Sequence, residues 1–265
     1  MKLSIITINY NNADGLKKTI ESVINQTSHD FEYIVIDGGS TDGSVEVIKQ
    51  YSGKLAYWVS EKDAGLYNAM NKGILKAKGE YCQFLNSGDW LTDNKVVAKM
   101  LEAMPDCSIF YGNLVKVFEN GKTYRDTAKE GNVSMLNLYR GTINHSSALI
   151  KRRLFAIYGM YDEQLKIVAD WKFFFIAVGL HDEPVKYINM DVTCFDMKGI
   201  SNTQGALDKK ERREVLEAYL PTSILADYDS HWADIEQMKR LNRYPFSRFV
   251  AWLMERGLFK WEKRK

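Results

Sequence analysis

The stretch Tyr33-Ile34-Val35-Ile36-Asp37-Gly38-Gly39-Ser40-Thr41-Asp42-Gly43 decides the fold of this chain. Its first four residues are apolar and favour a buried strand, which ends in an acidic, glycine-rich turn. A second apolar run, residues 81–85, ends in the same way in Asn86-Ser87-Gly88-Asp89. Open parallel sheets bind ligands just outside the carboxyl ends of their strands. Two acidic strand ends therefore predict one cleft for a nucleotide and a divalent cation.

Strands and helices alternate through the first hundred residues. The apolar patterns predict strands at residues 3–8, 33–36, 55–59 and 81–85, and helices after residue 14 and at 44–51, 66–76 and 93–104. This alternation implies parallel strands joined by right-handed crossovers. The second half is mixed: Asn120-Gly121 marks a hairpin between residues 108–117 and a strand from 123, with further strands near 146–150 and 185–195 and helices near 151–158 and 170–180. The sequence predicts an α/β fold with a mixed sheet flanked by helices.

Composition restricts the class of protein. The chain has 265 residues, 12% aromatic residues and a net charge of +2, which is typical of a folded protein and gives no sign of nucleic-acid binding. The three cysteines form no disulfide framework. The first apolar run is too short for a signal peptide, and the longest, residues 173–180, is too short to span a bilayer. We therefore expect a cytoplasmic protein.

The last sixty residues differ in character. Residues 206–265 predict helices broken at Pro221 and Pro245, and residues 240–265 hold eight Lys or Arg against two Glu, together with Trp252 and Trp261. Tryptophan among basic residues suits an anionic membrane surface, so we expect peripheral contact with the inner membrane. The alternative is a helix that packs on the domain or on a second copy of the chain.

Several motifs together resemble family-2 glycosyltransferases with the GT-A fold, most closely the bacterial members that build surface polysaccharides. They occur in order over roughly residues 1–200: Ser4–Asn11, Val35–Gly43, Glu61–Gly73, Phe84–Asp89, Asn144–Ser147, Gly159–Glu163 and Ala169–Trp171. The resemblance implies a GT-A domain at residues 1–205, a helical extension at 206–265, and Mn²⁺ or Mg²⁺ as cofactor. It also implies a nucleotide-sugar donor, which we expect to be a UDP-sugar, and a saccharide or lipid-linked saccharide acceptor, with inversion at the anomeric carbon.

The resemblance assigns the donor site to residues on the strand ends and the segment after residue 60. Asp37 ends a strand and matches the aspartate that contacts the nucleoside in the family, although a turn cap is the alternative. Gly38 lets the backbone approach the ligand. The complete expected donor set is Thr7, Asn9, Asp37, Gly38, Asp63, Asn68, Lys72, Asn86 and Ser87.

Asp89 and His145 are the expected metal ligands. Family members usually carry Asp-x-Asp-Asp where this chain has Asn86-Ser87-Gly88-Asp89, so a single carboxylate remains and the cation depends more on the diphosphate. Asp89 is otherwise a helix cap. A neutral His145 completes the cation's shell or contacts a phosphate, and the alternative is a hydrogen-bonded structural histidine.

Asp170 is the expected general base. It begins an apolar helix after Gly159-Met160-Tyr161-Asp162, the context in which the family's catalytic acid occurs. A helix cap is the alternative for Asp170, and Asp162 and Glu163 are alternative acids.

The sequence also bears on two other enzyme classes and on a non-catalytic role. A nucleotidyltransferase needs a glycine-rich basic loop after the first strand and a dehydrogenase needs Gly-x-Gly-x-x-Gly, and both motifs are absent. The remaining alternative is a non-catalytic sugar-nucleotide-binding or scaffolding subunit of a polysaccharide assembly complex.

Overall fold

The computed structural model describes residues 1–104, 106–127, 133–197 and 205–241. Within them the strands join one mixed sheet in the order β3-β2-β1-β4-β8-β6-β9-β5, and β7 pairs with β6. The strands are β1 (Leu3–Asn9), β2 (Phe31–Asp37), β3 (Tyr57–Ser60), β4 (Tyr81–Phe84), β5 (Trp90–Leu91), β6 (Ile109–Val117), β7 (Thr123–Asp126), β8 (Ala148–Lys151) and β9 (Val185–Asp196). The predicted α/β fold with a mixed, helix-flanked sheet is confirmed.

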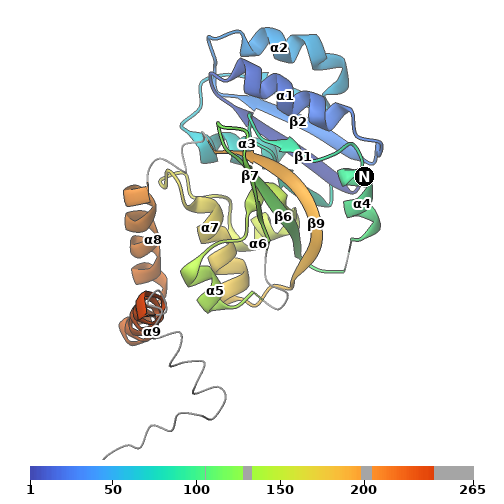
Figure 1. Cartoon of the computed structure of the whole chain (residues 1–265). Helices are drawn as coiled ribbons and strands as arrows, with labels where there is room; N and C mark the ends of the chain where they lie inside the picture. The colour runs from blue at the N-terminus through green and yellow to red at the C-terminus, as the bar shows by residue number, and fades with distance from the viewer. Residues whose placement is uncertain (105, 128–132, 198–204, 242–265) are drawn as a thin grey trace, which may run out of the picture. The chain divides into compact units, whose positions relative to one another are not determined.

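Helices cover both faces of the sheet (Figure 1). One face packs against α1 (Ala13–Ile24), α2 (Ser44–Tyr51) and α4 (Val96–Glu102) through the alternate side chains of β1 and β2. The other face packs against α3 (Leu66–Lys76), α5 (Met135–Arg140), α6 (Arg153–Tyr158) and α7 (Ala169–Phe174). A π-helical turn, η3 (Phe175–Leu180), continues α7, and short 3₁₀ turns occur at η1 (Ser52–Lys54) and η2 (His145–Ser147). β1 is buried along its whole length because both of its faces are covered.

Strand direction determines which segments meet at the carboxyl edge of the parallel strands. β1 pairs in parallel with β2 and β4, so the residues that follow all three strands lie at one edge. β8 runs antiparallel to β4, so the turn η2 that precedes β8 lies at this same edge. His145 therefore reaches the edge from the opposite chain direction.

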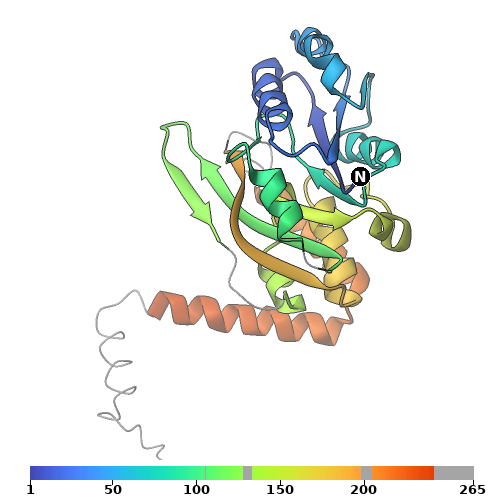
Figure 2. The same cartoon turned by 90° about the vertical axis from the view of Figure 1, so that its right-hand side faces the viewer.

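β6 and β9 form the long curved part of the sheet, and the β6–β7 hairpin extends beside them (Figure 2). The two strands pair in parallel, but the register shifts on either side of Asn113. A Cβ atom at Gly112 would lie 2.5 Å from the carbonyl oxygen of Met190. Glycine at this position allows the irregular part of β9 to approach β6.

Most expected elements occur within a few residues of their predicted limits, and α2 and α3 have the bounds expected. The structure adds two short elements that were not predicted, α5 and β5. Ser134 and Asn137 form a reciprocal capping box at the start of α5. Asp42 accepts hydrogen bonds from the backbone of Ser44 and Ala13, so it ties the turn before α2 to the start of α1.

The chain divides into two compact units, residues 1–213 and 214–265. The long helix α8 (Gly205–Tyr219) begins at the predicted boundary and supplies its first residues, up to Arg213, to the first unit. The described part of the second unit contains the end of α8 and α9 (Thr222–Leu241), with Pro221 between them. The basic segment 242–265 and the polar residues 198–204 lie outside the described residues.

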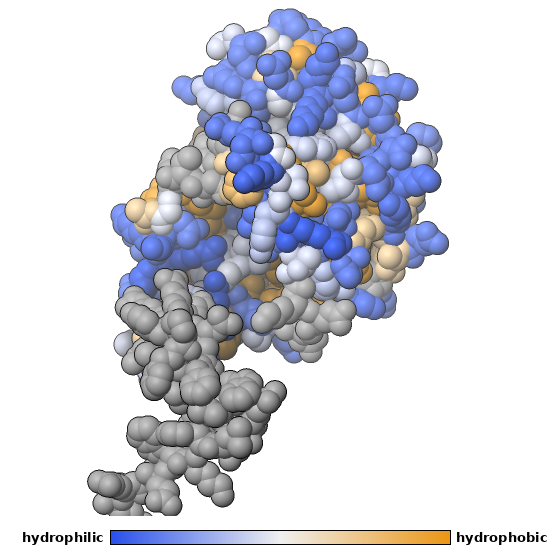
Figure 3. All heavy atoms as spheres, viewed as in Figure 1, coloured by the Kyte–Doolittle hydropathy of each residue, from blue (hydrophilic) through white to orange (hydrophobic). Residues whose placement is uncertain are grey.

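None of the described helices combines the length and apolar character needed to cross a membrane. In the space-filling view the described surface is mainly hydrophilic, with small apolar areas between polar ones (Figure 3).

Candidate functional site

The carboxylate of Asp37 organises the turn after β2. It is fully buried and accepts hydrogen bonds from Asn9 Nδ2 (2.7 Å), the Ser60 hydroxyl (2.6 Å), the Ser40 hydroxyl and the backbone N–H groups of Gly39 and Ser40. Burial alone would raise the pKa of Asp37, but the hydrogen bonds from Ser40, Ser60 and Asn9 outweigh it and hold the pKa below its usual value. A ligand that bonds this carboxylate must replace one of these donors.

Gly38 and Asp63 lie against each other beside that turn. A Cβ atom at Gly38 would lie 2.6 Å from Oδ2 of Asp63, so only glycine leaves room for the aspartate. Lys72 Nζ forms an ion pair with Glu61 Oε1 at 2.7 Å. Segment 61–72 thus brings Asp63 to the Asp37 turn, and Lys72 carries a carboxylate partner of its own.

The Asn86–Asp89 turn is fixed by α1 and by β9. The Thr19 hydroxyl donates to the carbonyl oxygen of Asp89 (2.6 Å), and Asn12 Nδ2 donates to that of Ser87 (3.0 Å). The backbone N–H of Asp196 donates to Asp89 Oδ1 (3.1 Å). Because α4 begins at Val96 with Lys95 as its N-cap, Asp89 does not cap that helix. Burial raises the pKa of Asp89 to about 7, and the Asp196 N–H and His145 offset part of this rise.

His145 and Asp170 form a direct pair. Nδ1 of His145 lies 2.9 Å from Oδ2 of Asp170, and the side chains are 19% and 14% exposed. Burial would lower the pKa of His145, but its hydrogen bond with Asp170 and the attraction between the two outweigh burial and raise it. For Asp170 burial would raise the pKa, but His145 and then Tyr67 outweigh it and hold it below its usual value. Asp170 is therefore ionised at neutral pH.

Tyr67 is a third member of this group. Its hydroxyl lies 2.9 Å from Oδ1 of Asp170 and also bonds the carbonyl oxygen of Ile167. Burial and the Asp170 carboxylate raise the pKa of Tyr67 well above its usual value, so the phenol keeps its proton.

Three buried polar atoms near the strand ends have no hydrogen-bond partner within the described part of the chain: Asn9 Oδ1, Asn86 Oδ1 and His145 Nε2. A buried polar atom without a partner is costly, which indicates that a ligand or ion completes it. Since Asp170 takes Nδ1 of His145, the ring offers Nε2, which is the arrangement of metal-bound histidines. Among the residues that the structure describes, no three His, Cys, Asp or Glu side chains gather as a metal site. The residues fit a cation held by two protein ligands and a diphosphate.

Two expected donor residues have other partners. Thr7 is fully buried, and its hydroxyl donates to Leu85 O (2.8 Å) and contacts the Tyr33 hydroxyl, so it links strands inside the sheet. Asn68 Nδ2 donates to Glu163 Oε2 (2.8 Å), and its Oδ1 accepts from the N–H of Ala64. The alternative acid Asp162 pairs with Lys172 at 2.7 Å. Thr7 and Asn68 thus contact other parts of the protein, whereas the sequence predicted that they contact the nucleotide-sugar.

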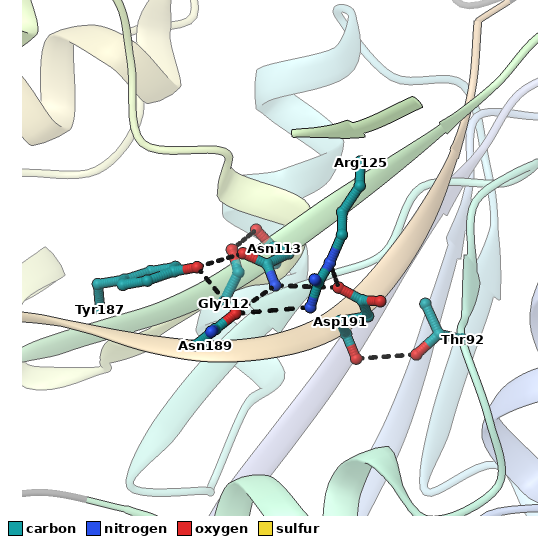
Figure 4. A network of polar contacts seen from close by, with 8 residues as sticks. Thr92, Gly112, Asn113, Arg125, Tyr187, Asn189 and Asp191 are labelled. Carbon is teal, nitrogen blue, oxygen red and sulfur yellow. Dashed lines mark hydrogen bonds and ion pairs between the residues drawn. The ribbon is translucent and has the colours of Figure 1, made fainter. Parts of the chain in front are cut away.

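A second polar group lies on β6, β7 and β9 (Figure 4). Asn113 is fully buried and donates to Asp191 Oδ1 (2.9 Å) and Asn189 Oδ1 (3.3 Å). The Tyr187 hydroxyl donates to Asn113 Oδ1, and Arg125 Nε donates to Asp191 Oδ1. We call these five residues the β9 network. It runs from the buried Asn113 to the exposed side chains of Asn189 and Arg125.

The β9 network is joined to the turn that carries His145. The Ser147 hydroxyl donates to the carbonyl oxygen of Gly112 (3.1 Å), and the Thr193 hydroxyl donates to that of Ser146 (2.8 Å). The two polar groups are therefore neighbours on one sheet.

Sequence reasoning did not find Tyr67, Glu211 or the β9 network. Tyr67 lies within the segment that resembles the family, but its partner is 103 positions away. Glu211 accepts backbone hydrogen bonds from residues 166–168, again across the chain. A local pattern does not reveal such contacts, and a buried glutamate in a polar helix sequence gives no signal.

The chain is similar to proteins of known family. The family model described as glycosyl transferase family 2 matches residues 4–160. A Mycobacterium tuberculosis glycosyltransferase described as uncharacterised is 45% identical over 103 residues, which is 38% of this chain and 39% of that protein. The PGL/p-HBAD biosynthesis glycosyltransferase of the same species is 27% identical over 209 residues, 76% of this chain and 79% of that protein.

Solved structures share the fold. TarS 1–349 of S. aureus in complex with UDP-GlcNAc has a TM-score of 0.66 at 21% identity, covering 82% of this chain and 64% of that one. The mannosyltransferase of Pyrobaculum calidifontis in complex with GDP-Man and Mn²⁺ has a TM-score of 0.56 at 16% identity, covering 80% and 60%. The chain thus spans less than two thirds of these structures and of the first M. tuberculosis relative.

Proposed function

This chain belongs to glycosyl transferase family 2, and from that premise we propose that it transfers a sugar, with inversion, from a UDP-sugar to a saccharide or lipid-linked saccharide acceptor of a surface polysaccharide. The observation that carries the proposal is the meeting of Asp89 and the His145–Asp170 pair at the carboxyl edge of the parallel strands, next to the Asp37 turn. The relative named for PGL/p-HBAD biosynthesis supports a glycolipid or polysaccharide product.

Donor binding falls to the strand ends in this proposal. Asn9, Asp37, Gly38 and Asp63 form the nucleoside side, where the turn after β2 and the unpartnered Asn9 Oδ1 lie together. Asn86 and Ser87 form the diphosphate side. The similar folds solved with UDP-GlcNAc and with GDP-Man support a nucleotide-sugar as the donor class.

Asp89 and His145 Nε2 would hold Mg²⁺ or Mn²⁺, which when bound neutralises the diphosphate of the donor. Asp89 supplies one carboxylate. Burial raises its pKa to about 7, and a cation beside it would favour the ionised form. Asn86 Oδ1 lies in the same turn as a further neutral oxygen. The solved mannosyltransferase with Mn²⁺ supports this cofactor class.

Asp170 takes the proton of the acceptor hydroxyl. A carboxylate has about four lone-pair sites, and His145 and Tyr67 use one on each oxygen, so a site remains for the acceptor. Its lowered pKa keeps the group ionised, and its partial exposure leaves it within reach of a substrate. The Asp170 carboxylate thus acts as general base.

The β9 network binds the acceptor saccharide. Amide, carboxylate, guanidinium and phenol groups are the polar groups that bond sugar hydroxyls, and Asn113 and Asp191 hold them in fixed positions. The links from Gly112 to Ser147 and from Thr193 to Ser146 place this surface beside the turn of His145.

The test of the proposal is Asp170→Asn, with Asp162→Asn as the matched control because Asp162 pairs with a lysine outside the Asp170 group. We expect transfer to fall at least about a hundredfold in Asp170→Asn, while a UDP-sugar still raises the melting temperature of the variant in the presence of Mn²⁺. Asp162→Asn should keep most of its activity. Full turnover by Asp170→Asn removes this residue from the mechanism.

The same assay separates the enzyme from a non-catalytic subunit. Wild-type protein that is stabilised by a UDP-sugar, yet neither transfers nor hydrolyses it with Mn²⁺ present, would be a donor-binding scaffold instead.

A further inference from the structure

The segment just before Asp170 is held by a helix far along the chain. Glu211 of α8 is 5% exposed, and its carboxylate accepts hydrogen bonds from the backbone N–H groups of Lys166 (2.8 Å), Ile167 (3.0 Å) and Val168 (3.3 Å). A buried carboxylate is tolerated when several donors satisfy it, and hydrogen bonds to a charged acceptor are the stronger ones. Glu211 thus fixes three consecutive peptide groups.

Those peptide groups have no local replacement for Glu211. Val168 is the N-cap of α7, and its side chain has no acceptor to offer the backbone. Removing the carboxylate would leave the buried N–H of Val168 and the part-buried N–H groups of Lys166 and Ile167 without this acceptor, which a native fold avoids by moving the segment.

The same segment is held from its other side by Tyr67. The Tyr67 hydroxyl bonds the carbonyl oxygen of Ile167 and also Oδ1 of Asp170. The N–H groups of the segment therefore face Glu211 of α8, while the Ile167 carbonyl faces α3. Movement of this segment changes the contact that Tyr67 makes with Asp170.

Arg212, the neighbour of Glu211, contacts the residue after Asp170. Its guanidinium lies 4.6 Å from the ring centroid of Trp171 and donates to the carbonyl oxygen of Gly141 at 3.0 Å. Trp171 Nε1 donates to the carbonyl oxygen of Leu138 at 2.8 Å. Adjacent residues of α8 thus contact the chain on both sides of Asp170.

We propose that Glu211 is a positioning residue for Asp170. It holds residues 166–168 so that the Asp170 carboxylate keeps its place between Tyr67 and His145. The inference rests on the proposed role of Asp170 as base, and it extends the site to a helix beyond residue 160, where the family match ends. Among the described residues, the hydrogen bonds of the Glu211 carboxylate all go to backbone groups of residues 166–168, so we expect its effect on the rate of transfer, with donor binding unchanged.

Glu211→Gln tests this, with Glu214→Gln as the matched control, because Glu214 is the exposed glutamate one turn later. Glutamine has one acceptor oxygen and presents an NH₂ group to a backbone donor. We expect kcat to fall ten- to a hundredfold with donor KM unchanged, since small displacements of a catalytic group have effects of this size. Hydrogen exchange should quicken at the amides of residues 166–168. Glu214→Gln should match the wild type in both measurements.

Exchange and kinetics judge separate parts of the proposal. If hydrogen exchange at residues 166–168 is unchanged in both Glu211→Gln and Glu211→Ala, Glu211 does not hold this segment. Faster exchange with unchanged kcat overturns the positioning role. A fall in kcat that Glu214→Gln shares, or that comes with an equal loss of donor affinity, overturns it too. Wild-type turnover by Asp170→Asn overturns the assigned base instead, and the exchange result still decides whether Glu211 holds the segment.

Discussion

Asp37 carries a charge into the interior because five donors from the turn after β2 and from β1 and β3 surround it. Two are backbone groups of the glycine-serine turn, and the others come from Asn9, Ser40 and Ser60. The carboxylate is thus held by β1, β2 and β3 together, and the turn at the donor site depends on it.

Asp37→Asn should destabilise the protein in a pH-dependent way. The folded pKa is depressed, so the stabilisation by Asp37 is present above the unfolded pKa and is lost as pH falls through the folded pKa. At pH 7 we expect the free energy of unfolding to fall by about 3 kcal/mol. At pH 3 the difference from wild type should be smaller. Urea unfolding at both pH values measures this.

The control is Asp14→Asn, an exposed aspartate of α1, for which we expect a change within about 0.5 kcal/mol at either pH. An equal loss at pH 7 and pH 3 for Asp37→Asn would show that the charge itself contributes nothing.

For single residues, the sequence indicated which charged side chains belong to the candidate site better than it indicated which residues they contact. Asp37 and Asp89 were expected from their place after apolar strands, and His145 and Asp170 from the family likeness. The partners of Thr7 and Asn68 depend on strand pairing and helix packing, so the buried contact of Thr7 with Tyr33 and the exposed contact of Asn68 with Glu163 were not predictable. Local sequence does not say which face of a neighbouring element a side chain meets.

At the scale of single elements, amphipathic helices were the most predictable. α2 and α3 have a clear apolar stripe and a glycine before the first residue, so both ends are defined. α5 has six residues, too few for a periodic pattern, although its capping box was a usable signal. The irregular pairing of β6 and β9 leaves no trace beyond Gly112, yet it creates the β9 network.

Strand β9 supplies the prediction for acceptor binding. Asp191→Asn removes the charge that holds Arg125 and Asn113, so acceptor KM should rise about tenfold, equivalent to about 1.4 kcal/mol, with donor KM unchanged. The matched control is Asp126→Asn on β7, next to Arg125, whose carboxylate pairs with Lys116 at 2.7 Å outside the network. Steady-state kinetics with each substrate varied in turn provides the measurement. Equal effects of the two variants on acceptor KM would show that the β9 network does not bind the acceptor.

For the whole molecule, the alternation of strands and helices predicted the parallel half, because crossover connections have one hand. The order of β8, β6, β9 and β5 was not predictable, since antiparallel strands can be joined in several ways. That order brings His145 to the edge where β4 ends. The attachment of α8 to the first unit was not predictable either, because α8 has little apolar periodicity and its attachment depends on Glu211 and Arg212.

The basic end of the chain provides a prediction at this scale. A chain that ends at Leu241 should bind less to vesicles that contain anionic phosphatidylglycerol, because each Lys or Arg near such a surface contributes about 1 kcal/mol. Transfer to a water-soluble acceptor should be unchanged. Sedimentation with vesicles, with neutral phosphatidylcholine vesicles as the control, measures this. Equal sedimentation of both chains with anionic vesicles would refute the proposed contact.

The attachment of α8 also bears on the construction of chimeric transferases. Exchange of acceptor specificity between relatives invites a junction at residue 160, where the family match ends, or at residue 205, where α8 begins. A junction at residue 205 would pair residues 166–168 with a foreign partner for their three amide groups, because Glu211 would come from the other protein. A junction at residue 160 keeps these amides with Glu211 but separates Asp170 from its own Tyr67 and His145. A junction after Arg213 transplants loop and carboxylate as one piece, and hybrids made there should keep their turnover.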